Sequence, residues 1–251
     1  MPGFPLKGVR VADFTWQGAG PFTTKHLADH GADVIRIESS RRLDGLRSGR
    51  PFRDGIPGVN RSGYFANRNS NKRTILLDLK HPKGHEIALR LIAQSDVVAN
   101  NFGRGTMEKL GLGYEDCRRV KPDIIYLVST VNGSEGPDAD EIGSGVTVVA
   151  MAGLTHLGGR PDMKPVGTGT SYSDHVTVPS HSAFAVLAAL RHRRRTGRGQ
   201  LIDVAQVETT TVLLGPIVMD YTVNGNVQTR NANRVSYAAP HGVYPCAGPG
   251  A

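Results

Sequence analysis

The feature that most constrains the fold is a strand–turn–helix–strand unit within the first forty residues. Residues 9–14 (VRVADF) form a short apolar run with strand character, and the turn at 17–21 (QGAGP) leads into a predicted helix over 22–30. Gly31 suits a helix C-cap, and residues 32–38 (ADVIRIE) are predicted as a second strand. Two strands joined by a helix in this way pair in parallel with a right-handed crossover. The sequence therefore predicts an α/β protein with a parallel sheet.

The same alternation continues along most of the chain. Further strands are predicted at residues 74–79, 96–99, 124–128 and 201–204, and further helices after Pro82 and at 114–120, 146–154, 178–195 and 205–221. Pro82 suits the first position of its helix, whose buried stripe is predicted to be Ile87, Leu91 and Ile92. Residues 39–70 carry seven arginines without periodicity, which indicates a long functional loop. The expected fold class is α/β, a Rossmann-like open and mostly parallel sheet flanked by helices.

The charge of the chain is positive but does not indicate nucleic-acid binding. The formal net charge is +8, and its densest part is the run at 191–195 (RHRRR). That run closes the predicted helix over 178–195, where cations interact favourably with the helix dipole. Because no aromatic stacking pattern or zinc-finger spacing accompanies the run, we predict no nucleic-acid partner. A basic surface also suits a small polyanion, such as a nucleotide-bearing cofactor.

Composition argues against several other classes of protein. No apolar run approaches the ~20 residues of a membrane span, and no signal-peptide segment is apparent near the start. Cys117 and Cys246 are too few for a disulfide framework or a zinc ligand set. We therefore expect a cytoplasmic protein with no membrane partner and no metal.

The first glycine turn has three interpretations that the residues alone leave open. Gly18 and Gly20 follow a strand and open a helix, and Glu38 ends the next strand, as in dinucleotide-binding sites. However, Thr23 replaces the third glycine of that motif, and Pro21 removes an N–H group that could hold phosphate. The turn therefore binds a different nucleotide-bearing ligand, binds a nicotinamide or flavin cofactor, or is a plain tight turn.

Six segments, taken together and in order, make the chain resemble a known family. They are residues 6–15 (LKGVRVADFT), 31–38 (GADVIRIE), 71–80 (NKRTILLDLK), 95–102 (SDVVANNF), 110–114 (LGLGY) and 196–204 (TGRGQLIDV). This set closely resembles the class III CoA-transferases, a family that also includes bile-acid CoA-transferases, formyl-CoA transferase and α-methylacyl-CoA racemase. The resemblance extends over nearly the whole chain.

The resemblance implies a CoA thioester substrate, a carboxylic acid acceptor and an aspartate nucleophile. In the segment 167–175 (GTGTSYSDH), Asp174 aligns with that nucleophile. A carboxylate can attack a thioester carbonyl and then carry CoA as an aspartyl thioester, which preserves the thioester energy. Backbone N–H groups of residues 167–170 are expected to help stabilise the oxyanions. Without the resemblance, a helix N-cap or turn acid before Pro179 is the preferred explanation of Asp174.

The resemblance also implies a set of CoA contacts. The matching positions, with cations for the phosphates included, are Gln17, Gly18, Ala19, Arg41, Leu77, Lys80, Asn101, Phe102 and Lys109. The family has a basic residue directly after the second strand, where this chain has Ser39, so Arg41 or Arg42 must replace it. For each lysine the alternative is a solvated surface charge.

Two departures from the family pattern keep other functions open. The racemase branch uses a histidine where our alignment places Ser144, and His175 is predicted to point away from Asp174 because neighbours in an extended segment face opposite sides. Relatives are also longer. We therefore expect a large CoA-binding domain at 1–224, a linker and the start of a small domain at 225–251, and an oligomer. Either a partner chain supplies the remainder, or the chain is a truncated product. The alternatives are an acyl-CoA racemase and a non-catalytic CoA-binding subunit.

Overall fold

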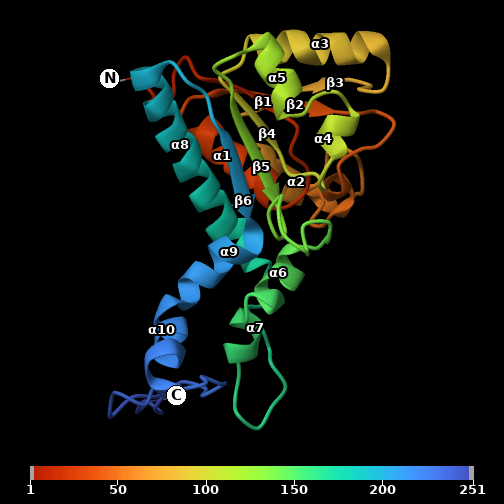
Figure 1. Cartoon of the computed structure of the whole chain (residues 1–251). Helices are drawn as coiled ribbons and strands as arrows, with labels where there is room; N and C mark the ends of the chain where they lie inside the picture. Colours follow the sequence, from red (N-terminus) through yellow and green to blue (C-terminus); the bar gives the residue numbers. More distant parts are fainter. Residues whose placement is uncertain (1–2, 249–251) are drawn as a thin grey trace.

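The computed structural model describes residues 3–248, and its centre is a six-stranded sheet (Figure 1). The strands are β1 (Arg10–Asp13), β2 (Asp33–Glu38), β3 (Arg73–Leu76), β4 (Val97–Asn100), β5 (Ile125–Thr130) and β6 (Leu201–Ala205). Their order is β3-β2-β1-β4-β5-β6, and every neighbouring pair is parallel. The predicted Rossmann-like open sheet is therefore confirmed. Its direction of winding reverses between β1 and β4, where ligands bind in such folds.

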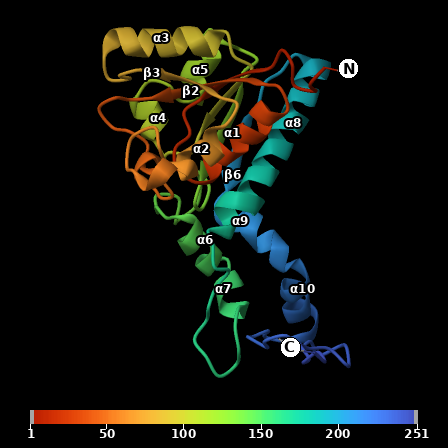
Figure 2. The same cartoon turned by 180° about the vertical axis from the view of Figure 1, so that it is seen from behind.

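Helices cover both faces of the sheet, as Figures 1 and 2 show from opposite sides. The long α8 (Val178–Thr196) packs beside α1 (Ala19–Asp29) on one face. The other face carries α3 (Pro82–Ala93), the one-turn α4 (Thr106–Lys109) and α5 (Tyr114–Val120). Two separate buried apolar clusters result, one under each layer. Because the central β4 is buried along its whole length, its sequence is an unbroken apolar run up to Asn100.

The helix boundaries follow local signals, with one error in the predicted buried face. Pro82 lies at the start of α3, and the His81 side chain caps it by accepting from the Lys83 backbone N–H. The buried residues of α3 are Gly84, Ala88 and Ile92, whereas Ile87 is 44% exposed. The prediction for Ile87 was wrong because the buried face of α3 follows a spacing of four residues through Gly84, Ala88 and Ile92, which leaves Ile87 beside it.

The basic run lies in the last turn of α8, as expected. Gly197 ends the helix in the left-handed conformation, with φ of 72°. Arg193 donates to the Asp96 carboxylate over 2.5 Å, so part of this charge serves to hold α8 against the β4 end of the sheet.

Residues 39–70 are more ordered than the expected loop. They contain the 3₁₀ turns η1 (Gly45–Ser48) and η2 (Arg53–Gly55) and the helix α2 (Gly63–Asn69). Ser62 caps α2 by accepting a hydrogen bond from the Phe65 N–H group over 3.1 Å. The absence of apolar periodicity hid this helix, because its buried member is an arginine, Arg68.

The remaining helices extend away from the carboxyl ends of the strands (Figure 1). They are α6 (Gly145–Met151), α7 (Leu154–Leu157), the π-helical η3 (Ser173–Thr177), α9 (Gln206–Thr211), η4 (Val212–Leu214) and α10 (Gly215–Asn224). The single helix predicted over 205–221 was wrong, because Gly215 and Pro216 begin a new helix, α10, after η4. Residues 225–248 form no helix or strand. No helix among the described residues is long and apolar enough to cross a membrane.

Candidate functional site

A cavity of about 720 Å³ lies at the carboxyl ends of the strands, centred on the β1–β4 switch point. It is lined by segments that follow all six strands, including residues 14–19, 39–42, 77–80, 101–103 and 130–131, together with Gln206. Eight of the nine residues expected to contact CoA line it, and so does Asp174. The structure therefore brings together predicted site residues that lie as much as 157 positions apart along the chain, Gln17 and Asp174.

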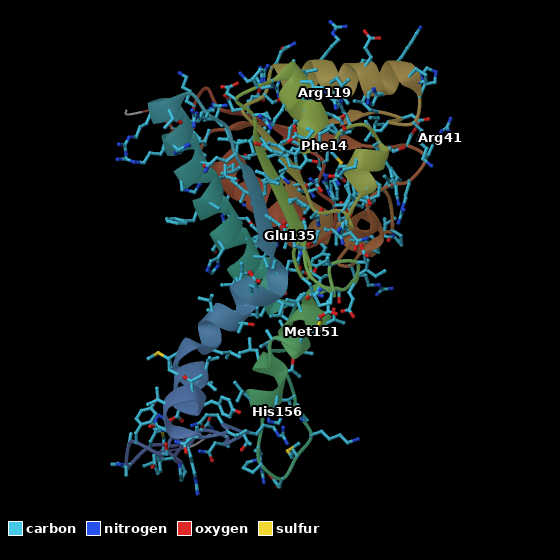
Figure 3. All side chains as sticks on the ribbon, in the orientation of Figure 1. Phe14, Arg41, Arg119, Glu135, Met151 and His156 are labelled. Atoms are coloured by element: carbon cyan, nitrogen blue, oxygen red, sulfur yellow. The ribbon has the colours of Figure 1, made fainter. Side chains whose placement is uncertain are left out.

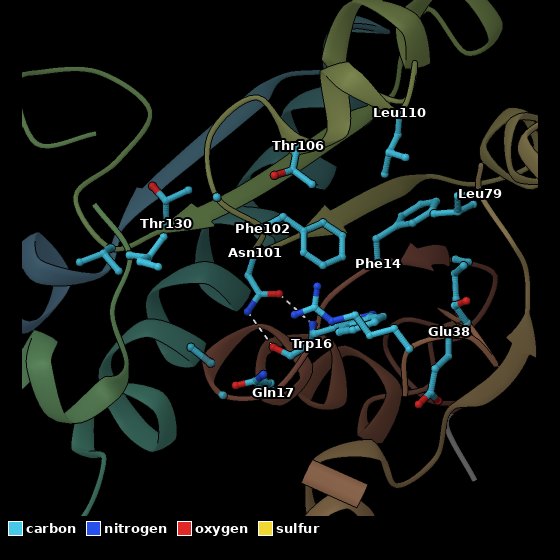
Figure 4. A pocket seen from close by; sticks show the side chains of 18 of the residues that line it. Phe14, Trp16, Gln17, Glu38, Leu79, Asn101, Phe102, Thr106, Leu110 and Thr130 are labelled. Carbon is cyan, nitrogen blue, oxygen red and sulfur yellow. Dashed lines mark hydrogen bonds between the residues drawn. The ribbon is translucent and has the colours of Figure 1, made fainter. Parts of the chain in front are cut away.

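The turn after β1 is held in shape by Asn101 (Figure 4). The Asn101 side chain accepts from the Trp16 backbone N–H over 2.8 Å and donates to the Trp16 carbonyl over 2.8 Å. Gln17 then adopts a positive φ of 60°, and its N–H group donates to the Asp44 carboxylate. The carbonyl oxygen and the amino group of the Asn101 side chain are both engaged in this way, so Asn101 fixes the conformation of the turn.

A buried ion pair supports the same turn from beneath. Asp13, at the end of β1, accepts from the Lys72 ammonium over 3.1 Å and from the Thr24 hydroxyl over 2.7 Å. Lys72 also donates to the Pro21 carbonyl in the first turn of α1. Burial lowers the pKa of Lys72, and the neighbouring Asp13 opposes that shift. In the sequence, Lys72 stood out only as part of a matching segment, and this role was missed.

Aromatic rings and cations line the outer part of the cavity. The Trp16 and Phe102 rings meet edge to face at 5.9 Å, and the Arg42 guanidinium lies 5.8 Å from the Trp16 ring. Figure 4 shows the Phe14 and Phe102 rings on this wall. Such surfaces suit a stacked base. Trp16 was not singled out from the sequence, although it is the chain's one tryptophan.

The predicted phosphate-binding cations divide into two groups. Arg41, Arg42 and Lys80 line the cavity, and Arg41 points outward at its rim (Figure 3) while pairing with Asp78 over 3.1 Å. Lys109 does not line it. In the single turn of α4, Met107 is buried and Thr106 faces the cavity, which leaves Lys109 exposed.

Glu38 lacks the free carboxylate that a dinucleotide site requires. Its Oε1 accepts from the Asp44 N–H and from Arg47, and its Oε2 accepts from Arg36 and Arg47. Burial acts to raise the pKa of Glu38, but these hydrogen bonds and the two guanidinium charges lower it to about 2. Since its acceptor sites are already occupied, the geometry does not favour a ribose contact at this position.

Asp174 lies where two helices begin. It belongs to η3, and its carboxylate fits against Gly18, which precedes α1, and against Gly145, the first residue of α6. A Cβ atom at either glycine would lie 2.6 Å from the carboxylate. Asp174 is therefore not the cap of α8, whose N-cap residue is Thr177. Its carboxylate instead faces backbone N–H groups of two other helices, an arrangement that favours an anion.

The electrostatic surroundings of Asp174 act in opposite directions. Burial raises the pKa of Asp174 above its usual value, whereas the Arg68 charge and the backbone N–H groups of Gly145 and Ala19 favour the ionised form. The net direction is upward.

His175 does not line the cavity. The segment is a π-helical turn rather than an extended strand, so the alternation argument was wrong. The His175 ring contacts Arg68 through Nε2 and the Thr170 hydroxyl through Nδ1. Because a guanidinium only donates hydrogen bonds, Nε2 must accept, which assigns the neutral Nδ1–H tautomer. Burial and the Arg68 charge both lower the pKa of His175.

The region around Asp174 differs from the expected one in its donors. Residues 167–170, expected to supply N–H groups, do not line the cavity. Gly143 and Ser144 line it instead, and Ser144 directly precedes α6. Among the described residues, no three His, Cys, Asp or Glu side chains form a group that could hold a metal ion.

Fold and site together define a class of protein: an open parallel α/β sheet with a nucleotide-sized cavity at its switch point and a half-buried carboxylate on the cavity wall. The comparison with family models agrees, since the model described as CoA-transferase family III matches residues 6–249. The chain belongs to CoA-transferase family III.

Several relatives are similar over most of this chain. Succinate–glutarate CoA-transferase of Agrobacterium fabrum is 38% identical over 97% of the chain, which covers 61% of that relative. Succinyl-CoA:glutarate CoA-transferase of Mus musculus is 37% identical over 87% of the chain, which covers 49% of it. The beta subunit of succinyl-CoA–L-malate CoA-transferase of Chloroflexus aurantiacus is 36% identical over 95% of the chain, which covers 58% of it.

Solved structures show the same fold. A CAIB/BAIF family protein of Brucella suis superposes with a TM-score of 0.88 at 34% identity, over 95% of this chain and 62% of its own. A protein of Mycobacterium tuberculosis gives a TM-score of 0.82 at 35% identity, over 89% of this chain and 61% of its own. This chain thus spans about three fifths of the length of most of these relatives.

Proposed function

We propose that this chain forms the CoA-binding and nucleophile-bearing part of a CoA-transferase, which moves CoA from an acyl-CoA to a carboxylic acid through Asp174. The observation that carries the proposal is the position of the Asp174 carboxylate on the wall of a cavity rimmed by cations and aromatic rings. Arg41, Arg42 and Lys80 suit phosphates, and Trp16 with Phe102 suits a base.

The proposed reaction begins when an oxygen of Asp174 attacks the thioester carbonyl carbon. The C–S bond breaks, CoA leaves as a thiolate, and a mixed anhydride remains on Asp174. The thiolate then attacks the Asp174 carbonyl carbon and releases the donor acid, which leaves an aspartyl-CoA thioester. An acceptor carboxylate repeats the two steps in reverse order and departs as the new acyl-CoA.

The N–H groups of Ala19 and Gly145 are the proposed donors to charge that develops on Asp174. Both favour the ionised carboxylate in the resting protein. When the thiolate adds to the Asp174 carbonyl, negative charge returns to an oxygen of the same group, so fixed donors at this place stabilise it without reorganisation.

We propose a short dicarboxylic acid as acceptor and succinyl-CoA as a donor. The support is the names of the relatives, which pair succinate or succinyl-CoA with glutarate or malate. An acyl-CoA racemase is less well supported, because Ser144, the residue aligned with the racemase histidine, has no basic group to abstract an α-proton. A non-catalytic CoA-binding subunit remains the alternative that the experiments below distinguish.

The nucleophile is tested by trapping. The purified chain is incubated with succinyl-CoA carrying a labelled acyl group and treated with hydroxylamine or borohydride, and the modified residue is located by mass spectrometry. We expect modification at Asp174 and its loss in Asp174→Asn. Asp162→Asn, which changes an exposed aspartate outside the cavity, serves as the matched control and should keep the modification. Modification elsewhere contradicts the nucleophile, and CoA binding without any modification favours the non-catalytic subunit.

The ligand class is tested separately by calorimetry with CoA and with NAD. We expect CoA to bind with a dissociation constant between the low micromolar and millimolar range, because a CoA-sized cavity with phosphate-binding cations is present. Binding of NAD with no binding of CoA contradicts the proposal.

A further inference from the structure

Three cationic side chains are fully buried, and one of them has no carboxylate partner. Arg36 pairs with Glu38 over 2.5 Å and with Asp44 over 2.6 Å, and Lys72 pairs with Asp13. Arg68 is equally buried, at 0% exposure, yet within residues 3–248 it forms no ion pair closer than 4.0 Å. Burying a charge is costly unless something compensates for it, so an unpaired internal arginine requires an explanation.

The Arg68 guanidinium is held by aromatic rings. It lies 3.8 Å from the centre of the Tyr64 ring and 5.8 Å from that of Phe22, and it donates to the Tyr64 hydroxyl over 2.8 Å. Its Nε and Nη1 atoms are buried and have no hydrogen-bond partner among the described residues. The stack compensates part of the desolvation cost but leaves the positive charge unneutralised.

That charge is directed at the segment that carries the proposed nucleophile. Arg68 contacts His175, the neighbour of Asp174, and its charge favours the ionised form of Asp174. The other groups that act on the Asp174 charge are the backbone N–H of Ala19 in α1 and that of Gly145 in α6. Arg68, which belongs to α2, is the one charged side chain among the described residues that has this effect.

We propose that Arg68 is a positioning residue, whose unpaired charge holds Asp174 as a carboxylate and fixes His175 as the neutral Nδ1–H tautomer. A direct ion pair would hold the carboxylate more firmly but would also occupy its oxygens. Arg68 acts from the side of His175 and does not line the cavity, so the Asp174 oxygens stay accessible. The catalytic meaning of this inference rests on the proposed function, but the charge effect on Asp174 does not.

The charge effect is tested by titrating Asp174 directly. The chain is labelled with ¹³C at aspartate carboxyl carbons, and the Asp174 resonance is assigned from its loss in Asp174→Asn. Arg68→Gln and Arg68→Lys form the matched pair, because both lose the planar guanidinium and only the glutamine variant loses the charge. Arg53→Gln, at an arginine whose side chain is 82% exposed, is the external control.

We expect the titration midpoint of Asp174 to rise by on the order of one pH unit in Arg68→Gln, since removal of a nearby opposite charge destabilises the ionised form. The midpoint should stay close to that of the unmodified chain in Arg68→Lys and Arg53→Gln. Equal midpoints in the glutamine and lysine variants overturn the proposal. If Arg68→Gln fails to fold, Arg68→Met replaces it in the comparison with Arg68→Lys, because methionine keeps the packing against Tyr64 without a charge.

A second readout connects the charge to the chemistry. The rate of Asp174 modification by succinyl-CoA is measured as a function of pH. The pH at which this rate falls on the acidic side should be higher in Arg68→Gln than in the wild-type chain, but unchanged in Arg68→Lys. If succinyl-CoA modifies Asp174 neither in the wild-type chain nor in any variant, the proposed function is wrong. The carboxyl titration still decides the role of Arg68 in that case. If neither the pH–rate profile nor the titration midpoint of Asp174 changes in Arg68→Gln, the inference itself is wrong.

Discussion

Two glycines make room for the Asp174 carboxylate, and neither has a positive φ. Gly18 and Gly145 stand where any Cβ atom would collide with the carboxylate, at 2.6 Å in both cases. The resemblance gave Gly18 only as a CoA contact, and Gly145 was not singled out. Because the requirement comes from a side chain about 156 and 29 positions away, no local pattern reveals it.

The glycine requirement predicts a specific loss in Gly145→Ala. The added methyl group must displace the carboxylate, and a displacement of about 1 Å at a reacting group can reduce a rate ~10²-fold. Modification of Asp174 by succinyl-CoA should fall accordingly, while circular dichroism should show a folded protein.

Gly215→Ala is the matched control for this prediction. Gly215 is also the first residue of a helix, α10, but a Cβ atom there meets nothing within 4 Å. The control should react at the rate of the unmodified chain. If Gly145→Ala reacts equally fast, the carboxylate is not held between the two helix starts as described.

The resemblance to the family was sufficient to predict part of the site. The resemblance identified Asp174 and eight residues that line its cavity. It could not show that the Asn101 amide is bound to the backbone of Trp16, which lies 85 positions earlier, or that an arginine in an aperiodic segment is buried against His175. Lys109, by contrast, was expected to contact CoA but is exposed. On a helix as short as α4, a shift of one position decides whether a side chain faces the cavity or solvent.

At the scale of elements, the segment 39–70 is attached to the sheet by an ionic cluster. Arg36 and Glu38 of β2 are bound to Asp44 and Arg47, and the guanidinium of Arg47 lies 3.8 Å from the Phe65 ring of α2. The cluster holds Asp44 in place, and Asp44 in turn accepts from the Gln17 N–H of the first turn. The shape of the cavity is thus coupled to the protonation state of buried carboxylates.

The cluster predicts a stability that depends on pH. The pKa of Glu38 is about 2 in the folded chain against an ordinary value of 4.5, so its stabilising contribution is complete above about pH 4.5 and is lost as the pH falls toward 2. The contribution is on the order of 3 kcal/mol, since a tenfold difference in proton affinity between the folded and unfolded chain corresponds to ~1.4 kcal/mol.

Denaturant unfolding between pH 6 and pH 2.5 measures this contribution. Glu38→Gln should lower the free energy of unfolding at pH 6 and flatten its dependence on pH in the acidic range. Glu135→Gln changes a glutamate that is exposed on the surface (Figure 3) and should leave the curve unchanged. If the free energy of unfolding of Glu38→Gln depends on pH as steeply as that of the wild-type chain, groups other than Glu38 cause this pH dependence.

Elements with strong local signals were predicted well, and those that depend on distant partners were not. The helix α5 begins and ends at the predicted residues, Tyr114 and Val120, because acidic residues open it and basic ones close it. The helix α2 has no apolar stripe, since its buried face consists of Arg68 on an aromatic support. The break before α10 was missed because the apolar spacing continues across Gly215 and Pro216.

At the scale of the whole molecule, the described residues leave apolar surface uncovered. None of the residues of α10 is buried, and Met219, Tyr221 and Val223 are between 60% and 75% exposed. Figure 2 shows α7 and α10 extending away from the sheet, at the bottom of the view. An exposed apolar helix surface of this kind usually marks a contact with another chain or segment.

We therefore predict that the 251-residue chain self-associates when it is purified alone. Light scattering should give a mass above the 26.9 kDa of one chain. The double variant Met219→Lys with Val223→Lys should lower that mass without weakening CoA binding, because α10 does not line the cavity. A thermally stable monomer shows that this surface needs no partner, and would argue against the expected oligomer.

All six strands end at the cavity, and the pairing of β1 with β4 ties the two halves of the sheet together directly beneath it. Within the described residues, a ligand can therefore not be admitted by one lobe rotating away from another. Ligand exchange must use the connections at the rim, where Ser39, Arg41, Arg42 and residues 141–144 line the cavity without belonging to a helix or strand. Such loops move in nanoseconds to microseconds. Opening of this part of the site should then be fast compared with most enzyme turnover times, and the sheet beneath it should stay still throughout.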